Sequence, residues 1–159
     1  MSKSKIRLTA LLALFLATAT LVSCNNTTTV TVPATPIVRA INPPGAEVSP
    51  NFSNGILAGD TMYVAGTQGT DSSGKLPDGI GPQTTAALQN IEAILKAGGF
   101  SLNDVVSVNV YLADIHDFAD MNKAYVAIMP DPKPTRTTVQ VAALVNGAKI
   151  EISAIAVKH

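Results

Sequence analysis

The sequence predicts an α+β domain in which two helices pack on one face of a mixed β-sheet. Three observations favour this class: short apolar runs with a two-residue period, two stretches with helical periodicity, and turn residues between them. Along the chain these elements follow the order β-β-α-β-α-β-β. A domain of about 120 residues buries only a small core. The second face of the sheet is half apolar, which favours contact with another subunit.

The first predicted elements are a hairpin and a helix. The stretch "GILAGDTMYVAGTQG" (55–69) contains two apolar runs separated by Gly-Asp, which is typical of a hairpin. A loop rich in Gly, Pro and Asp follows at 71–82. From Pro82, the spacing of apolar residues predicts a helix that ends at Gly98-Gly99 and buries one stripe: Ala87, Leu88, Ile91, Ile94 and Leu95.

The middle of the chain predicts a strand and a second helix. The stretch "DVVSVNVYLAD" (104–114) alternates, so one face of the strand carries Val106, Val108, Val110 and Leu112. Asp117 is the predicted N-cap of the next helix. That helix has one apolar face, formed by Phe118, Met121, Tyr125 and Met129, and it ends at the prolines that begin with Pro130.

Two further strands are predicted at the C-terminal end, near 136–143 and 149–157. The connection "LVNGAK" contains Asn146-Gly147, a dipeptide that favours a tight turn between antiparallel strands. The two strands are therefore expected to form a hairpin.

The N-terminal segment is typical of an export signal. Lys3, Lys5 and Arg7 precede the apolar stretch "LTALLALFLATATLV", which is too short and too rich in threonine to favour a membrane span. The stretch ends in "LVSC", a pattern similar to the bacterial lipobox, with Cys24 as the only cysteine of the chain. We expect residues 1–23 to be removed and Cys24 to carry lipid. The alternative is ordinary signal cleavage near this position.

This interpretation predicts three parts: a lipoprotein signal peptide (1–23), a Thr/Pro-rich tether (24–38) and one domain (39–159). The lipid would anchor the domain to a membrane, facing outside the cytoplasm. Removal of the signal leaves eight basic and eleven acidic residues, and this mildly acidic balance disfavours a nucleic-acid partner. A single cysteine excludes a disulfide within one chain, so the fold depends on its apolar core.

The motifs of several kinds of site are missing. The sequence contains neither of the glycine-rich motifs that hold phosphates and no HExxH or CxxC motif. Its two histidines, His116 and His159, offer no cluster for a metal ion or a nucleophilic triad.

Arg136 and Glu151 are conspicuous, because each interrupts a strand-like run in a chain with 14% charged residues. An arginine presents a planar fork that matches a carboxylate, and a glutamate on a neighbouring strand can orient or deprotonate a water molecule. By alternation, Arg136 shares a strand face with Thr138. The alternative, which spacing alone favours, is a structural salt bridge between the two strands.

The C-terminal residues resemble the signature of the RidA (YjgF) family. "PTRTTVQVAALVNGAKIEISAIAVKH" follows its pattern P-x-R, V-x-V, a turn, and then I-E-I-x-A-I-A. Further upstream, "FSNGILAGDTMYVAGTQG" and "QTTAALQNIEAILKAGGFSLNDVVSVNVYLADIHDFADMNKAYVAIM" are also similar to family sequences. The resemblance covers the chain from about Ile41 to its end.

This resemblance implies a chorismate-mutase-like fold and a homotrimer with three clefts between subunits. Active family members hydrolyse reactive 2-imino and 2-amino-enoic acids to 2-keto acids and ammonia, without a cofactor or metal. The residues that match the family's functional positions imply roles here. Arg136 would bind the substrate carboxylate and Glu151 would position the water. The backbone carbonyl near Thr138 would meet the substrate nitrogen, and Asn122 would line the cleft.

Two cleft positions depart from the family pattern. Phe52 stands where the family has a tyrosine, and Ala65 stands where it has a serine, so two hydroxyl groups are missing. These changes favour an altered substrate range, and they also leave open a trimeric module that binds small carboxylates without catalysis. A purely structural lipoprotein would not require a buried Arg136 and Glu151. The acidic balance gives little support to a ribonuclease, an activity ascribed to some relatives.

Overall fold

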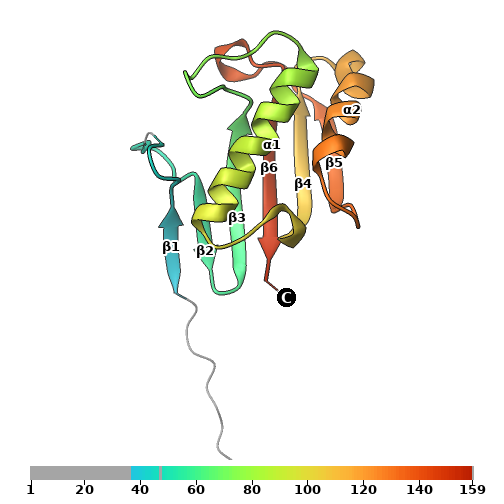
Figure 1. Cartoon of the computed structure of the whole chain (residues 1–159). Coiled ribbons are helices and arrows are strands. Elements are labelled where there is room, and N and C mark those ends of the chain that lie inside the picture. The colour runs from blue at the N-terminus through green and yellow to red at the C-terminus, as the bar shows by residue number, and fades with distance from the viewer. Residues whose placement is uncertain (1–36, 47, 159) are drawn as a thin grey trace, which may run out of the picture. The chain divides into compact units, whose positions relative to one another are not determined.

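A computed structural model describes residues 37–46 and 48–158 of the chain (Figure 1). The predicted signal peptide, Cys24 and the tether up to residue 36 lie outside these residues. The strands are β1 (Val38–Ile41), β2 (Gly55–Ala58), β3 (Thr61–Gln68), β4 (Val105–Leu112), β5 (Thr135–Gln140) and β6 (Ile150–Val157). The helices are α1 (Ile80–Ala97) and α2 (Phe118–Ile128), with short 3-10 turns at η1 (Leu102–Asp104), η2 (Ile115–Asp117) and η3 (Val145–Gly147).

The six strands form one mixed sheet in the order β1-β2-β3-β6-β4-β5. β4 and β5 are parallel, and every other neighbouring pair is antiparallel. Both α-helices lie on the same side of this sheet (Figure 1). The predicted fold class is therefore confirmed. No helix among the described residues is long and apolar enough to span a membrane.

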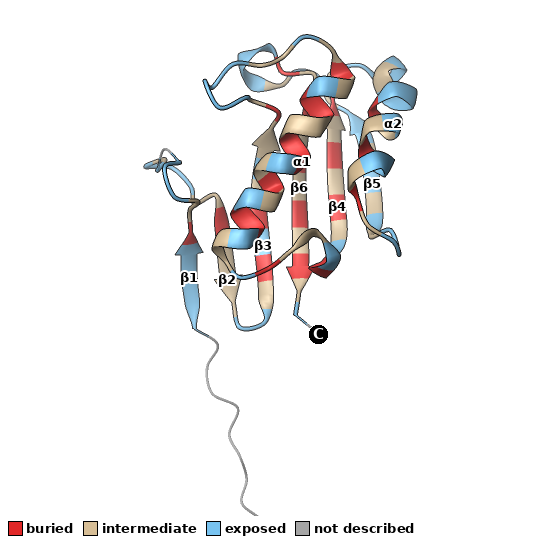
Figure 2. Cartoon of the chain, in the orientation of Figure 1, coloured by how far each residue is buried: buried red, intermediate tan, exposed pale blue. Residues whose placement is uncertain are grey.

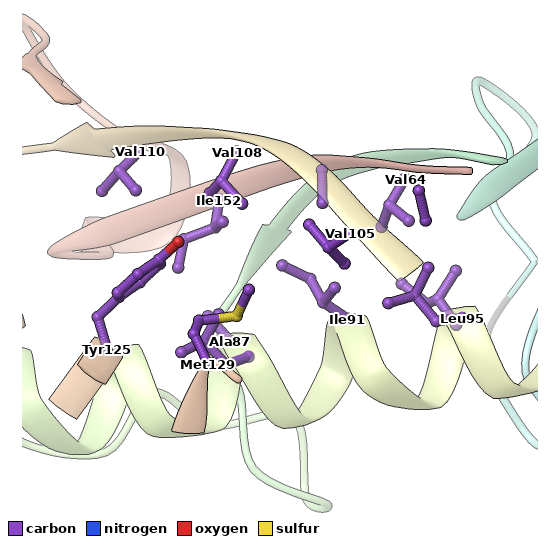
Figure 3. Packing of buried hydrophobic residues seen from close by; sticks show 14 of the residues in the cluster. Val64, Ala87, Ile91, Leu95, Val105, Val108, Val110, Tyr125, Met129 and Ile152 are labelled. Carbon is purple, nitrogen blue, oxygen red and sulfur yellow. The ribbon is translucent and has the colours of Figure 1, made fainter. Parts of the chain in front are cut away.

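The core lies between the sheet and the inner face of α1, and Figure 2 shows buried residues recurring along α1 and along the central strands. All five apolar residues predicted for the α1 stripe are buried. Figure 3 shows Ile91 and Leu95 of α1 facing Val64 and Val105 of the sheet. Full burial of one such side chain contributes about 1.5–3 kcal/mol, so a small core without disulfides can hold the domain.

The predicted C-terminal hairpin is wrong. β5 pairs in parallel with β4, whereas β6 lies between β3 and β4 and pairs antiparallel with both. Asn146 and Gly147 do take positive φ values, 59° and 72°, but they lie in the η3 turn of a longer crossover. The alternation of buried and half-buried residues along β6 explains why this strand lies inside the sheet. Its buried residues Ile150, Ile152, Ala154 and Ala156 fill the centre of the sheet, while the more polar β5 takes the edge.

Three local predictions also differ from the structure. β1 was missed because only its last residue, Ile41, is buried, and its first, Val38, belongs to the predicted tether. Val106 is exposed rather than buried because a β-bulge shifts the register there, and Val105 takes the inward position. Asp117 makes no side-chain capping bond, because its carboxylate lies 3.4 Å from Lys149 Nζ instead.

Asp104 gives the fold a measurable pH dependence. Burial opposes its ionisation, but the Ser101 backbone N–H (2.7 Å) and Lys158 Nζ (3.0 Å) donate to its carboxylate and hold its pKa below the ordinary 3.8. Because the carboxyl has a lower pKa in the folded than in the unfolded protein, it adds to the free energy of unfolding at every pH above 3.8. This added stability is lost as the pH falls through the pKa of the folded state. We expect Asp104→Asn to lower the thermal midpoint at pH 7, with the difference shrinking as the pH falls below 3.8. Calorimetry over a series of pH values tests this, and a difference that stays equal at every pH would contradict it.

Candidate active site

Glu151 lies at the start of the central strand β6, on the sheet face away from the helices. Its cross-strand neighbours are Tyr111 of β4 and Gln68 of β3. The side-chain amide of Gln68 donates to Glu151 Oε2 at 3.4 Å and to the Val145 carbonyl at 3.1 Å. Gln68 thereby links the glutamate to the η3 turn. The sequence analysis did not single out Gln68, because the neighbour of Glu151 depends on the strand order.

Two cavities border Glu151. The larger, about 970 Å³, is a groove between the end of β3, the segment after β1, residues 90–94 of α1 and the η3 turn. Phe52, Ala65 and Glu151 all line this groove, so the structure brings three of the predicted site residues together. The smaller, about 370 Å³, lies beside Tyr111 and Ser153.

The walls of the groove are fixed by amide side chains of α1. Asn90 Nδ2 donates to the carbonyls of Gln68 (3.1 Å) and Thr70 (2.9 Å), which holds the end of β3 against the helix. Gln83 accepts from the Lys149 backbone N–H at 2.8 Å and so fixes the chain just before Glu151. These residues position the acid but were not predicted, because their partners lie about 20 to 66 residues away in sequence.

Gly66 allows Glu151 its position. A Cβ atom at Gly66 would overlap the carboxylate of Glu151, so only glycine leaves room for the acid to lie across β3. Gly66 borders both cavities together with Glu151.

Arg136 lies in a different place, on the edge strand β5. Its register partner is the buried Val108, so its side chain points to the face that the helices cover. Its guanidinium carbon is 4.6 Å from the centre of the Tyr125 ring and 5.7 Å from that of Phe118, both on α2. Within the described residues, Arg136 has no ion pair and no hydrogen bond from its side chain.

Thr138 and Asn122 belong to the same region as Arg136. Thr138 follows Arg136 on the same face of β5, and its buried hydroxyl has no partner in the described part of the chain. Helical spacing sets Asn122 on the side of α2 that carries Phe118 and Tyr125. Burial raises the pKa of the Tyr125 phenol, and the charge of Arg136 only partly opposes this. The ring beside the arginine is therefore neutral at ordinary pH.

The predicted site residues thus form two clusters on opposite faces of the sheet. β4 separates β5 from β6, and the residue of β6 in line with Arg136 is Ala154, not Glu151. The alternative of a cross-strand salt bridge is therefore wrong. Within residues 37–46 and 48–158, no three His, Cys, Asp or Glu side chains form a group that could hold a metal ion.

The protein is thus an α+β domain with a mixed sheet covered on one side by two helices. In the part of the chain that the structure describes, an acid lines a surface groove and an arginine without an ion pair lies on an edge strand. The family model described as "Endoribonuclease L-PSP" matches residues 44–158. The chain therefore belongs to this family, to which RidA proteins and 2-imino acid deaminases also belong.

Three similar proteins illustrate the relationship. The 2-iminobutanoate/2-iminopropanoate deaminase of Rattus norvegicus is 44% identical over 109 residues, which cover 67% of this chain and 80% of the relative. The structure of RidA from an Antarctic Psychrobacter is 38% identical with a TM-score of 0.72, and the match covers 76% of this chain and 99% of that one. Escherichia coli TdcF with bound serine is 32% identical with a TM-score of 0.70 and the same coverage.

The contact between Gly66 and Glu151 can be tested by Gly66→Ala. The added methyl group meets only the flexible end of the glutamate, so we expect the unfolding free energy to change by less than about 1 kcal/mol while the carboxylate moves away from β3. Denaturant unfolding and a crystal structure of the variant measure the two effects. Gly81→Ala is the matched control, because a Cβ there meets nothing within 4 Å. An unmoved carboxylate in Gly66→Ala would contradict the assignment.

Proposed function

We propose that this protein hydrolyses reactive 2-imino and 2-amino-enoic acids to 2-keto acids and ammonia. The observation that carries the proposal is the guanidinium of Arg136, which has no acidic partner among the described residues and so remains available to a substrate carboxylate. The activity named for the rat relative supports the same substrate class.

In this mechanism Arg136 binds the carboxylate through two parallel N–H donors and fixes the C=N carbon near a water held by Glu151. Glu151 takes a proton from the water molecule while the water oxygen adds to the C=N carbon. Glu151 then passes this proton to the imine nitrogen. The resulting carbinolamine loses ammonia, and its hydroxyl becomes the carbonyl of the 2-keto acid. The backbone carbonyl near Thr138 accepts from the substrate nitrogen, and Asn122 lines the cleft. As ammonia leaves, the hydroxyl proton passes to the nitrogen, so substrate positioning and these proton transfers account for the rate increase.

The site is proposed to form between copies of the chain, as in a homotrimer with clefts between subunits. Arg136 and Glu151 point to opposite faces of one sheet, so one chain does not bring both to a single small substrate. A second copy can supply the missing half to each cleft. The arginine, Thr138 and Asn122 would then come from one subunit, and the glutamate, Phe52 and Ala65 from its neighbour.

The second candidate function is binding of small carboxylates without catalysis. The groove beside Glu151 lacks hydroxyl groups at Phe52 and Ala65, which leaves fewer groups to orient a water or an intermediate. The structure of TdcF with bound serine supports recognition of an amino acid within this family. Binding would use the same arginine, so only a rate measurement separates the two functions.

We also propose that the protein is an exported lipoprotein attached to a membrane through Cys24. The support is in the sequence alone: a basic start, an apolar stretch and "LVSC" with the single cysteine at its end. The threonine-rich residues that follow would separate the domain from the membrane surface.

Arg136→Ala tests the proposed reaction. Imines are generated in situ by an amino-acid oxidase and trapped with semicarbazide, so an active protein lowers semicarbazone formation. We expect the domain from Thr27 to the end to do so, and Arg136→Ala to lose at least about 100-fold in kcat/KM. Arg136→Lys keeps the charge but not the two parallel donors, so it should recover only part of the activity. Glu151→Gln should lower kcat with little change in KM.

Co-expression of the Arg136→Ala and Glu151→Gln chains extends this test. If each cleft takes its two charges from different subunits, random mixing restores about a quarter of the wild-type sites. Recovery of activity by the mixture, with both parents inactive, supports the shared site. A wild-type protein that binds 2-oxobutanoate but hydrolyses no imine of small, branched or aromatic side chain would refute the deaminase and favour binding.

Lipid attachment is tested by Cys24→Ser in the full chain. Metabolic labelling with an alkyne fatty acid in a bacterial host should label the wild type and leave the variant unlabelled, and the variant should leave the membrane fraction. The serine keeps size and polarity but offers no thiol for the lipid. Equal labelling of both chains would count against this attachment site.

A further inference from the structure

The guanidinium of Arg136 lies over two aromatic rings of α2. Phe118 and Tyr125 are seven residues apart, which is about 10.5 Å along a helix axis. Because seven residues make nearly two turns, both residues lie on the same side of the helix. The guanidinium carbon is 4.6 Å from the centre of the Tyr125 ring and 5.7 Å from that of the Phe118 ring, so it contacts both.

This arrangement holds the arginine without using its hydrogen-bond donors. An aromatic ring attracts the flat face of a guanidinium, whereas a carboxylate binds to the N–H groups at its edge. A protein acid beside Arg136 would occupy these donors and compete with a ligand. Within the described residues no acid forms an ion pair with Arg136, and two ring contacts, with Tyr125 and Phe118, are made by its charged group.

The two rings are anchored differently. Tyr125 is 3% exposed and points from α2 toward the strand side chains Val108, Val110 and Ile152, as Figure 3 shows. Its hydroxyl has no hydrogen-bond partner in the described part of the chain, so the ring rather than the hydroxyl makes the contact that matters. Phe118 is 39% exposed, and the core does not depend on it.

We propose that Tyr125 and Phe118 are positioning residues that clamp Arg136 by its faces and present its N–H edge to the substrate carboxylate. This role rests on the proposed function, because that function supplies the substrate carboxylate that Arg136 would bind. It adds to that function by assigning the orientation of the arginine to two residues that do not touch the substrate.

The test replaces each ring by an aliphatic side chain or by another ring. Phe118→Leu and Tyr125→Leu remove a ring face, whereas Phe118→Tyr and Tyr125→Phe preserve it. Once a substrate is bound, its carboxylate holds the guanidinium in the productive orientation, so the leucine variants should weaken binding and raise KM about three- to tenfold with kcat nearly unchanged. Calorimetry with 2-oxobutanoate should show the same loss of affinity. The ring-preserving variants should match the wild type, and Tyr125→Phe should not lower the thermal midpoint.

The outcomes separate the two proposals. If Arg136→Ala loses activity but Phe118→Leu and Tyr125→Leu keep the wild-type KM, the clamp is refuted and the deaminase stands. If the leucine variants lower kcat as well, or Tyr125→Phe behaves like Tyr125→Leu, the residues act through stability and the clamp is again refuted. If the wild type neither hydrolyses imines nor binds 2-oxobutanoate, the proposed function fails and the role of the clamp fails with it. The upfield ring-current shift of the Arg136 side-chain protons, measured by NMR, still reports whether the contact itself exists.

Discussion

The position of β6 between β3 and β4 is the constraint on which the rest of this structure depends. Its even-numbered residues from Ile150 to Ala156 are buried against the helices, so Glu151 is forced onto the other face. The same insertion makes β3 and β4 parallel to each other, which requires α1 to cross over the sheet. It also moves β5 to the edge, where Arg136 meets α2. Core and candidate site therefore follow from one strand order.

The two charged residues are held in ways that suit ligands better than stability. Each residue belongs to a β-strand, so the hydrogen bonds of the sheet fix the position of its backbone. The contacts of its side chain then set the direction in which the charged group points. Among residues 37–46 and 48–158, Glu151 accepts one long hydrogen bond, from the neutral Gln68 amide, and Arg136 contacts two ring faces. A salt bridge between them would satisfy both charges but would leave neither free. Only 14% of the residues are charged, yet Arg136 and Glu151 do not pair with each other. This separation is consistent with each of them binding a ligand or another subunit.

The groove beside Glu151 is less polar than the family pattern implies. Phe52 and Ala65 remove two hydroxyl groups, while Gln68 and Asn90 supply amides that organise the backbone around the acid. An amide can fix a carboxylate in place but cannot donate a hydroxyl proton to an intermediate. The groove wall at Phe52 and Ala65 is therefore apolar, and Glu151 is the acid that lines it.

The sequence by itself determined the element types, the buried stripe of α1, and the hairpin of β2 and β3, because periodicity and turn residues are local signals. It also carried the family signature through Arg136 and Glu151. Only the tertiary structure decided that Asn146-Gly147 lies in a crossover rather than a hairpin, that a bulge turns Val106 outward, and that Arg136 and Glu151 lie on opposite faces. Strand order and register depend on which apolar faces pack together across the whole sheet, and no short stretch of sequence contains that competition.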